Sequence, residues 1–266
     1  QLHLLLPASS ILGSAWMDRL VRASPWPVYA VAMGAAPFWR AMLSEMPAVL
    51  KHFETQDMLM VLDAYDMVFA NCKPDSILFE YRKHEKPLLV SAEKFCFPKD
   101  IGSCPSCADS YCRNSDFHYL NSGGIMGTAD ALSHAFLWMQ ENTPDTGDDQ
   151  AAWHLYHRKF PERVALEHQP RIWVTLQGAV MEQFVVRSGE RCGVVEYQNS
   201  EVCFLHGNGA AKNKELPELY SQMEASCGRA WSPAKVIGGS HGFAGMSFYK
   251  GISCKINSSK ALRLSV

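Results

Sequence analysis

Two aspartates directly follow a short apolar run, Met58 to Leu62, in the segment Asp63-Ala-Tyr-Asp66. Five consecutive apolar residues are typical of a strand buried on both faces, and ligands of open α/β sheets lie beyond the carboxyl ends of such strands. Carboxylate oxygens are preferred by hard cations such as Mg²⁺ and Mn²⁺, which often bind phosphate oxygens as well. The pair therefore indicates a divalent metal bound with a diphosphate, although an isolated pair of this spacing is also typical of a helix cap beside a solvated carboxylate.

Four further polar motifs lie later in the chain. They are Ser91-Ala-Glu-Lys-Phe-Cys-Phe-Pro98, Tyr119-Leu-Asn-Ser-Gly-Gly124, Gly147-Asp-Asp-Gln150 and His206-Gly-Asn-Gly209. An imidazole such as that of His206 suits Mn²⁺ better than Mg²⁺, and adjacent glycines allow the backbone to approach phosphates closely. Asp148 and Asp149 stand where a helix begins, so they could cap that helix or act chemically. Asn121 could bind sugar hydroxyls, or its segment could form a tight turn before a strand at 125–126.

The elements that would position these motifs alternate between strands and helices. Apolar runs predict strands at 2–6, 28–33, 58–62, 87–90 and 202–205. Helical periodicity predicts helices at 14–23, 38–53 with a break or kink at Pro47, 74–81, 129–141, 150–160 and 215–225. This alternation predicts an α/β fold with a mostly parallel sheet. Residues 94–118 lack periodicity, which indicates a long loop of the kind that often carries function.

Length, composition and charge exclude several classes of protein. At 266 residues and 47% hydrophobic, the chain can bury a substantial core, and we predict a single domain over 1–266 in which 212–266 form a C-terminal extension. A formal net charge of -2 provides no general attraction to nucleic acid or anionic membranes. No apolar run is long enough for a transmembrane segment, and the start of the chain lacks the features of a signal peptide. The sequence does not indicate an oligomeric state.

Nine cysteines are too few at this length for a disulfide-built scaffold, and their odd number leaves at least one unpaired within the monomer. Cys104, Cys107 and Cys112 crowd one polar loop. We predict a disulfide there rather than a zinc site, for which His118 is the candidate fourth ligand. The segment Asn257-Ser-Ser259 is a glycosylation acceptor pattern, which is meaningful if the protein enters the secretory pathway.

The order and spacing of the motifs, from about Leu2 to about Lys212, resemble one known family. The chain is similar to the glycosyltransferase domain of the procollagen lysyl hydroxylase/glycosyltransferase enzymes and, more distantly, to the collagen galactosyltransferases. The resemblance implies a GT-A-like, Rossmann-like fold in the secretory pathway. It implies Mn²⁺-dependent transfer of glucose or galactose from a UDP-sugar, with retention, to hydroxylysine or galactosyl-hydroxylysine in a collagen-like peptide.

The resemblance also implies a role for each motif. The metal ligands would be Asp63, Asp66 and His206. The contacts with the nucleotide would come from Tyr65, which would stack on uracil, and from Gly207, Asn208 and Lys212 near the diphosphate. The groups at the sugar and the acceptor would be Asp148, Asp149, Glu93, Cys96 and Asn121. One departure is Phe97, where these enzymes typically carry Trp, because phenylalanine lacks the indole N–H and could change the donor or acceptor preference.

Two other interpretations fit the same sequence. The first is a UDP-hexose transferase that acts on a different protein, glycan or small hydroxyl compound. The second is an inactive domain that binds nucleotide sugar or collagen, although every ligand position of the motif is occupied. No His-x-Asp iron site is evident, so the chain is not expected to hydroxylate lysine.

Overall fold

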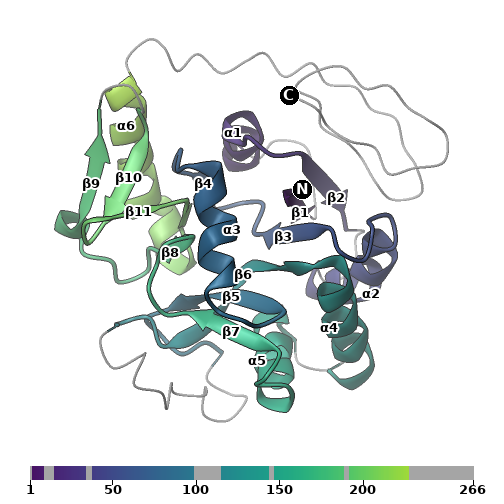
Figure 1. The fold of residues 1–266 in the computed structure, drawn as a ribbon. Coiled ribbons are helices and arrows are strands. Elements are labelled where there is room, and N and C mark those ends of the chain that lie inside the picture. Colours follow the sequence, from purple (N-terminus) through teal and green to yellow (C-terminus); the bar gives the residue numbers. More distant parts are fainter. Residues whose placement is uncertain are drawn as a thin grey trace, which may run out of the picture.

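Six strands form the central sheet, in the order β2-β1-β3-β6-β5-β7 (Figure 1). Their bounds are Leu2–Ala8 (β1), Val28–Ala32 (β2), Met58–Leu62 (β3), Leu88–Glu93 (β5), Tyr119–Thr128 (β6) and Val164–Glu167 (β7). β6 is antiparallel to both of its neighbours, and the other pairs are parallel, so five of the six strands point the same way. This computed structural model confirms the predicted α/β fold with a mostly parallel sheet. It describes residues 2–8, 15–33, 38–98, 115–143, 147–188 and 192–227.

Alternating side chains of the sheet enter two apolar cores. In β3, Leu59 and Val61 face one core, whereas Met60 and Leu62 face the other, as the period of two in a strand requires. The first core is covered by α2 (Phe38–Leu50), α4 (Ala129–Asn142) and α5 (Asp149–Lys159). The second is covered by α1 (Ala15–Ala23) and α3 (Pro74–Arg82), and Figure 1 shows α3 in front of the sheet. Each described helix is too short or too polar to cross a lipid bilayer.

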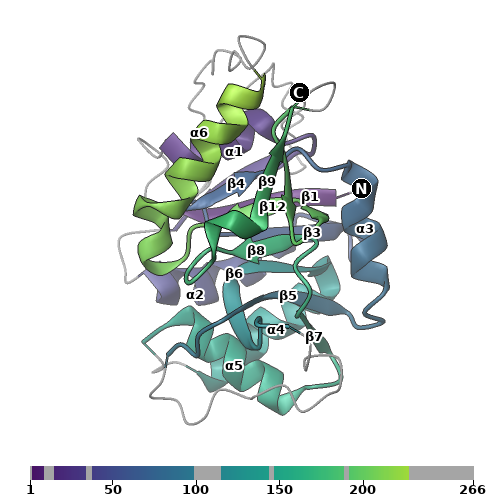
Figure 2. The same cartoon turned by 90° about the vertical axis from the view of Figure 1, so that its left-hand side faces the viewer.

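Two three-stranded sheets lie beside the central one, and of their strands the sequence predicted only the run at 202–205, which overlaps two of them. The first contains β4 (Met67–Phe69), β12 (Phe204–His206) and β8 (Trp173–Thr175), and the second contains β9 (Phe184–Arg187), β10 (Val194–Tyr197) and β11 (Ser200–Val202). α6 (Glu215–Cys227) lies beside the second sheet (Figure 2). Two short 3₁₀ helices, Met181–Gln183 and Gly209–Asn213, complete the elements of the described ranges. Strands of three or four residues show too few alternations for a pattern to reveal them.

The structure decides two points on which the sequence left alternatives open. Residues 121–124 are not a tight turn, because they lie inside β6 and pair with β3 and β5. Pro47 lies inside α2, which continues past it to Leu50 instead of breaking there. The cysteine loop from Cys104 to Cys112 and the acceptor pattern at Asn257 lie outside the described residues, and the single domain over 1–266 stays a prediction.

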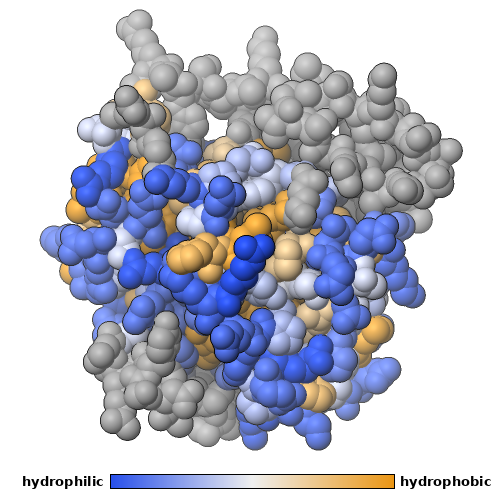
Figure 3. All heavy atoms as spheres, viewed as in Figure 1, coloured by the Kyte–Doolittle hydropathy of each residue, from blue (hydrophilic) through white to orange (hydrophobic). Residues whose placement is uncertain are grey.

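Apolar side chains also reach the surface. Figure 3 shows a mainly hydrophilic face with an apolar strip near its middle, on the side where α3 lies. Phe79 of α3 is 61% exposed there and carries the ammonium group of Lys83 4.3 Å from its ring centre. A single exposed phenylalanine partly covered by a lysine stem is ordinary surface chemistry and does not indicate a binding site.

A disulfide joins Cys72, which follows β4, to Cys203, which precedes β12, and closes a loop with a sequence separation of 131 residues. We expect the double replacement of Cys72 and Cys203 by serine to lower the free energy of unfolding by roughly 2–4 kcal/mol, because the unfolded chain regains the entropy of that loop. Denaturant unfolding would measure the loss. The matched control replaces Cys192 and Cys227, which are only 35 residues apart and also form a disulfide. A larger loss in this control would contradict the argument from loop length.

Candidate active site

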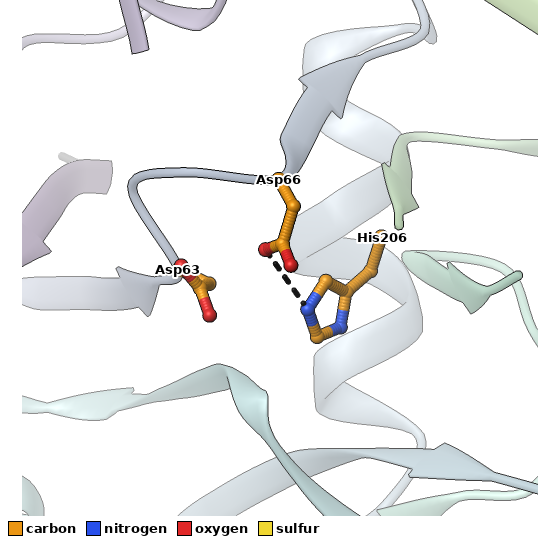
Figure 4. Close-up of side chains that lie close together, drawn as sticks. All are labelled: Asp63, Asp66 and His206. Carbon is orange, nitrogen blue, oxygen red and sulfur yellow. Dashed lines mark ion pairs between the residues drawn. The ribbon is translucent and has the colours of Figure 1, made fainter. Parts of the chain in front are cut away.

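Asp63, Asp66 and His206 point toward one another at the carboxyl edge of the sheet (Figure 4). Asp63 directly follows β3, Asp66 directly precedes β4, and His206 ends β12. One ligand atom from each residue lies within 4.8 Å of those of the other two, and His206 Nε2 is 3.3 Å from Asp66 Oδ1. The structure therefore brings together all three residues that the sequence suggested as metal ligands.

Backbone hydrogen bonds fix these three residues from neighbouring strands. The amide of Gly207 donates to the carbonyl of Asp66 at 2.8 Å, and the amide of Asp63 donates to the carbonyl of Gly123 at 2.9 Å. The amide of Tyr65 donates to Asp63 Oδ1 at 3.1 Å, which orients that carboxylate. The site is therefore built by the sheets and not by a free loop.

The electrostatics of the three residues fit a bound cation. Burial, together with the charge of Asp66, raises the pKa of Asp63 to about 6. Burial lowers the pKa of His206, but the attraction of Asp66 and Asp63 outweighs it and raises that pKa overall. Asp66 Oδ1 is paired with His206 Nε2, whereas the other ring nitrogen, His206 Nδ1, is one of several buried polar atoms in the described residues that have no hydrogen-bond partner. A divalent cation would relieve the repulsion between the carboxylates, and two carboxylates with one imidazole suit Mn²⁺.

Gly123 packs directly against the imidazole of His206. A Cβ atom at position 123 would lie 2.1 Å from His206 Cε1, far closer than van der Waals contact allows. At the next position, a Cβ atom on Gly124 would lie 2.7 Å from Trp173 Nε1. The two glycines in β6 therefore permit the close approach of β12 and β8 to the central sheet.

A cavity of about 530 Å³ opens beside the three ligands. Its wall contains most of the polar residues that the sequence singled out: Asp63, Asp66, Glu93, Cys96, Asn121, Asp148, Asp149, His206 and Asn208. Phe95 and Phe97 also line it, and their side chains are 49% and 53% exposed. A cavity with clustered carboxylates, amides and two accessible aromatic rings suits a polar ligand that carries a ring.

Glu93 is held by amides and is only 3% exposed. Gln150 Nε2 donates to Glu93 Oε1 at 2.6 Å, and Asn208 Nδ2 donates to Glu93 Oε2 at 2.9 Å. The same Gln150 accepts a hydrogen bond from Asn121 Nδ2 at 3.3 Å. Glu93 is thus bonded to two other motifs of the sequence analysis through Gln150 and Asn208, and Gln150, to which the sequence assigned no role, also connects it to Asn121.

The first turn of α5 carries the two aspartates of the third motif. Asp148 Oδ1 accepts a hydrogen bond from the amide of Ala151 at 3.1 Å, so Asp148 caps the helix and also lines the cavity. Asp149 lines the cavity as well, and burial, followed by the charge of Asp148, raises its pKa. Capping and a chemical role are therefore compatible here.

Four of the suggested residues are placed less favourably for the roles that the resemblance implied. Tyr65, Gly207 and Lys212 are not part of the cavity wall. A Cβ atom on Gly207 would meet Leu216 Cδ2 at 2.8 Å, so this glycine allows packing of α6. Cys96 lines the cavity but is disulfide-bonded, so it has no thiol for acid–base or nucleophilic chemistry.

The link between Glu93 and Gln150 can be tested by Gln150→Glu. Burial raises the pKa of Glu93, and a second carboxyl group at 150 would face it in place of the donor now 2.6 Å away. We expect the free energy of unfolding to fall by roughly 1–3 kcal/mol at pH 7.5, and by less at pH 5, where the two carboxyls can share a proton. Denaturant unfolding of this variant and of Gln140→Glu, on the exposed face of α4, would measure both. An equal loss at both pH values would contradict the carboxyl pairing.

Comparison with known proteins identifies the family. A model of the PLOD GT domain matches residues 41–232. The human multifunctional procollagen lysine hydroxylase and glycosyltransferase LH3 is 31% identical over 173 residues, which cover 61% of this chain and 22% of that protein. The Drosophila melanogaster procollagen-lysine,2-oxoglutarate 5-dioxygenase is 26% identical over 168 residues, or 60% of this chain and 22% of that protein. The chain therefore spans about a fifth of the length of these relatives.

A solved structure supports the same fold. A glycosyltransferase involved in the glycosylation of the major capsid of PBCV-1 is similar, with a TM-score of 0.52 at 10% identity, over 83% of this chain and 98% of that chain. The likeness at this identity concerns the fold alone. Because the family model covers most of the chain, we conclude that the protein belongs to the PLOD GT domain family, the glycosyltransferase domains of the lysyl hydroxylases, with a GT-A-like α/β fold.

Proposed function

We propose that this domain binds a UDP-sugar through Mn²⁺ and transfers glucose or galactose, with retention, to a hydroxyl acceptor. The observation that carries the proposal is the cluster of Asp63, Asp66 and His206 on the wall of a cavity that also contains Asp148 and Asp149. When bound, the cation would neutralise the charge that gathers on the departing diphosphate.

Other residues of the cavity would act on the sugar, the acceptor and the phosphates. Asp148 and Asp149 lie at the start of α5, where a carboxylate beside the anomeric carbon could stabilise positive charge or accept the proton of the acceptor. Asn121 and Asn208 offer amide groups for sugar hydroxyls or phosphate oxygens, and the hydrogen bonds to Gln150 and Glu93 hold both in place. Asp63 and Asp66 with His206 would supply the metal ligands, and Lys212 and Tyr65 would contact the nucleotide.

The acceptor that we propose is hydroxylysine or galactosyl-hydroxylysine in a collagen-like peptide. It is motivated by the relation to LH3, a multifunctional procollagen lysine hydroxylase and glycosyltransferase. The disulfides Cys72–Cys203 and Cys192–Cys227 are typical of proteins of the secretory pathway, which is oxidising. That compartment is consistent with a collagen-like acceptor. A different hydroxyl acceptor is favoured by Phe97, whose exposed ring stands where Trp is expected.

The release of UDP by the purified protein tests the proposal. The assay would compare several UDP-sugars with Mn²⁺ or with a chelator, and with galactosylated, plain or no hydroxylysine peptide. Metal-dependent release that one peptide stimulates would support both donor and acceptor. Metal-dependent release without a peptide effect would retain the transferase and reject the collagen acceptor, and no release with any donor would favour an inactive binding domain.

A further inference from the structure

A second, smaller cavity of about 240 Å³ lies beside the one described above. Three segments far apart in the sequence form it: residues 115–117 before β6, residues 169–171 between β7 and β8, and the turn between β10 and β11. The proposed transfer reaction assigns no role to this cavity. Its wall carries hydroxyl, amide, carboxylate and guanidinium groups from Ser115, Asp116, Gln169, Arg171, Gln198 and Ser200.

Buried hydrogen bonds hold the cavity in shape. His168 Nδ1 contacts the carbonyl oxygen of Phe117 at 2.7 Å. The carboxylate of Glu167 accepts hydrogen bonds from the amides of Arg171, Ile172 and Trp173, which fixes the start of the second segment. The rings of Phe117 and Tyr197 meet edge to face at 5.8 Å. These contacts fix the positions of the segments that form the wall.

One wall residue is displayed by an unusual turn. The two-residue turn between β10 and β11 places Gln198 at φ 48° and Asn199 at φ 62°, both in the left-handed region. Turns of this geometry favour Asn-Gly, and glutamine has no local advantage at such a position. The left-handed backbone puts the exposed Gln198 on the cavity rim, where its Nε2 donates to the Tyr197 hydroxyl at 3.2 Å. Strained residues of this kind are often retained at ligand contacts.

The two cavities share the end of the β5–β6 ladder. The amide of His118 donates to the carbonyl of Glu93 at 3.1 Å. Glu93 lines the first cavity, and Phe117, the residue before His118, lines the second. Lys94, adjacent to Glu93, forms an ion pair with Asp116 at 3.4 Å. Phe117 and Asn121 are four residues apart in the sequence, so their Cα atoms lie at most roughly 14 Å apart.

We infer that the second cavity binds the peptide backbone of the acceptor several residues from the hydroxyl group that is modified. This inference rests on the proposed function and names peptides as the acceptor class. A polyproline-type chain advances about 3.1 Å per residue and leaves its backbone amides and carbonyls free, so about four residues span the two cavities. The side-chain amides of Gln169 and Gln198 in the wall can donate hydrogen bonds to backbone carbonyls and accept them from backbone amides. The wall also carries one negative and one positive group, Asp116 and Arg171.

The aromatic rings of the second cavity favour a peptide over a second sugar. Phe117 and Tyr197 are each 2% exposed. A pyranose ring is bound best by an accessible aromatic face, and these two rings present none. In the first cavity Phe95 and Phe97 are half exposed, as a sugar subsite would require. The two cavities therefore differ in a way that suits a sugar in one and a peptide backbone in the other.

Fluorescence anisotropy tests the inference by binding alone, with Mn²⁺ and UDP present. The probes are a labelled three-residue collagen-like peptide with galactosyl-hydroxylysine and two nine-residue versions, extended on the amino or the carboxyl side. We expect one extension to improve binding by about 5- to 10-fold, the effect of one or two hydrogen bonds. The double variant Gln198→Ala, Arg171→Ala should lose that gain and bind the short peptide as the wild type does. The matched control, Gln140→Ala on the exposed face of α4, should keep it.

Two outcomes would overturn the inference: no gain from either extension, or a gain that survives in the double variant. A failure of the proposed function is recognised separately, as an absence of UDP release from every donor. Because binding is measured without turnover, an inactive domain that binds long peptides through this cavity would still support the inference.

Discussion

Replacement of Asp66 by alanine is expected to reduce Mn²⁺-dependent UDP release by roughly 10³-fold or more, since a metal ligand and a charge aimed at the diphosphate are lost together. The side chain is 8% exposed and lies at the cavity, outside the apolar cores. Its removal also ends the repulsion with Asp63 that contributes to the raised pKa of that residue. The same substitution removes the ion pair with His206 Nε2 at 3.3 Å, so the two effects oppose each other and the free energy of unfolding without metal should change little.

Two measurements check this result. Calorimetric titration with Mn²⁺ should show binding in the wild type and in Asp75→Ala, which removes an exposed aspartate in the first turn of α3, and none in Asp66→Ala. UDP release should follow the same order. Wild-type activity in Asp66→Ala would disprove the metal assignment, whereas lost activity with intact Mn²⁺ binding would leave Asp66 with another role.

The change of Gly123 to alanine should disable the same site although it replaces none of the candidate ligands. The new methyl group would overlap His206 Cε1, and β6 is too firmly paired on both sides to move away. We expect the affinity for Mn²⁺ to fall by about 10- to 100-fold, as for other changes that displace a metal ligand. We expect the free energy of unfolding to fall by roughly 1–3 kcal/mol.

Gly124→Ala provides the matched control. It adds the same methyl group one residue later, but there the group meets the ring of Trp173, which is not a candidate ligand. Both variants should lose stability, and only Gly123→Ala should lose Mn²⁺ affinity out of proportion to that loss. Equal effects on Mn²⁺ binding would mean that the strand as a whole, and not the His206 contact, controls the site.

The sequence predicted the large elements because they leave strong local patterns, and the resemblance to the family assigned the three candidate metal ligands. The run Met58 to Leu62 is a buried strand, and the two aspartates after it reach the sheet edge as expected. The direction of β6 was not predictable, since periodicity does not distinguish parallel from antiparallel pairing. That direction matters, because it brings the start of β6, with Asn121 and Gly123, to the edge where β3 and β5 end.

The rest of the site depends on tertiary contacts, which a sequence pattern does not show. Gln150 stood in a recognised motif without an assigned role, since only the fold shows that its amide bridges Glu93 and Asn121. The signal in the sequence that could have pointed to Gln150 was its position directly after the acidic pair at 148–149. Lys212 lies in a 3₁₀ helix and is exposed, and no pattern in the sequence reports on which side of such a helix a lysine lies. The nucleotide-binding roles of Lys212 and Tyr65 stay predictions.

The three candidate ligands lie at positions 63, 66 and 206, so the metal would tie together parts of the chain that are about 140 residues apart. No such cluster exists in the unfolded chain, and a cation that binds only the folded form stabilises it by about 2.7 kcal/mol at 100 times its dissociation constant. With the proposed metal, the supply of manganese in the cell would therefore set how much of this domain escapes degradation, as well as how fast it works.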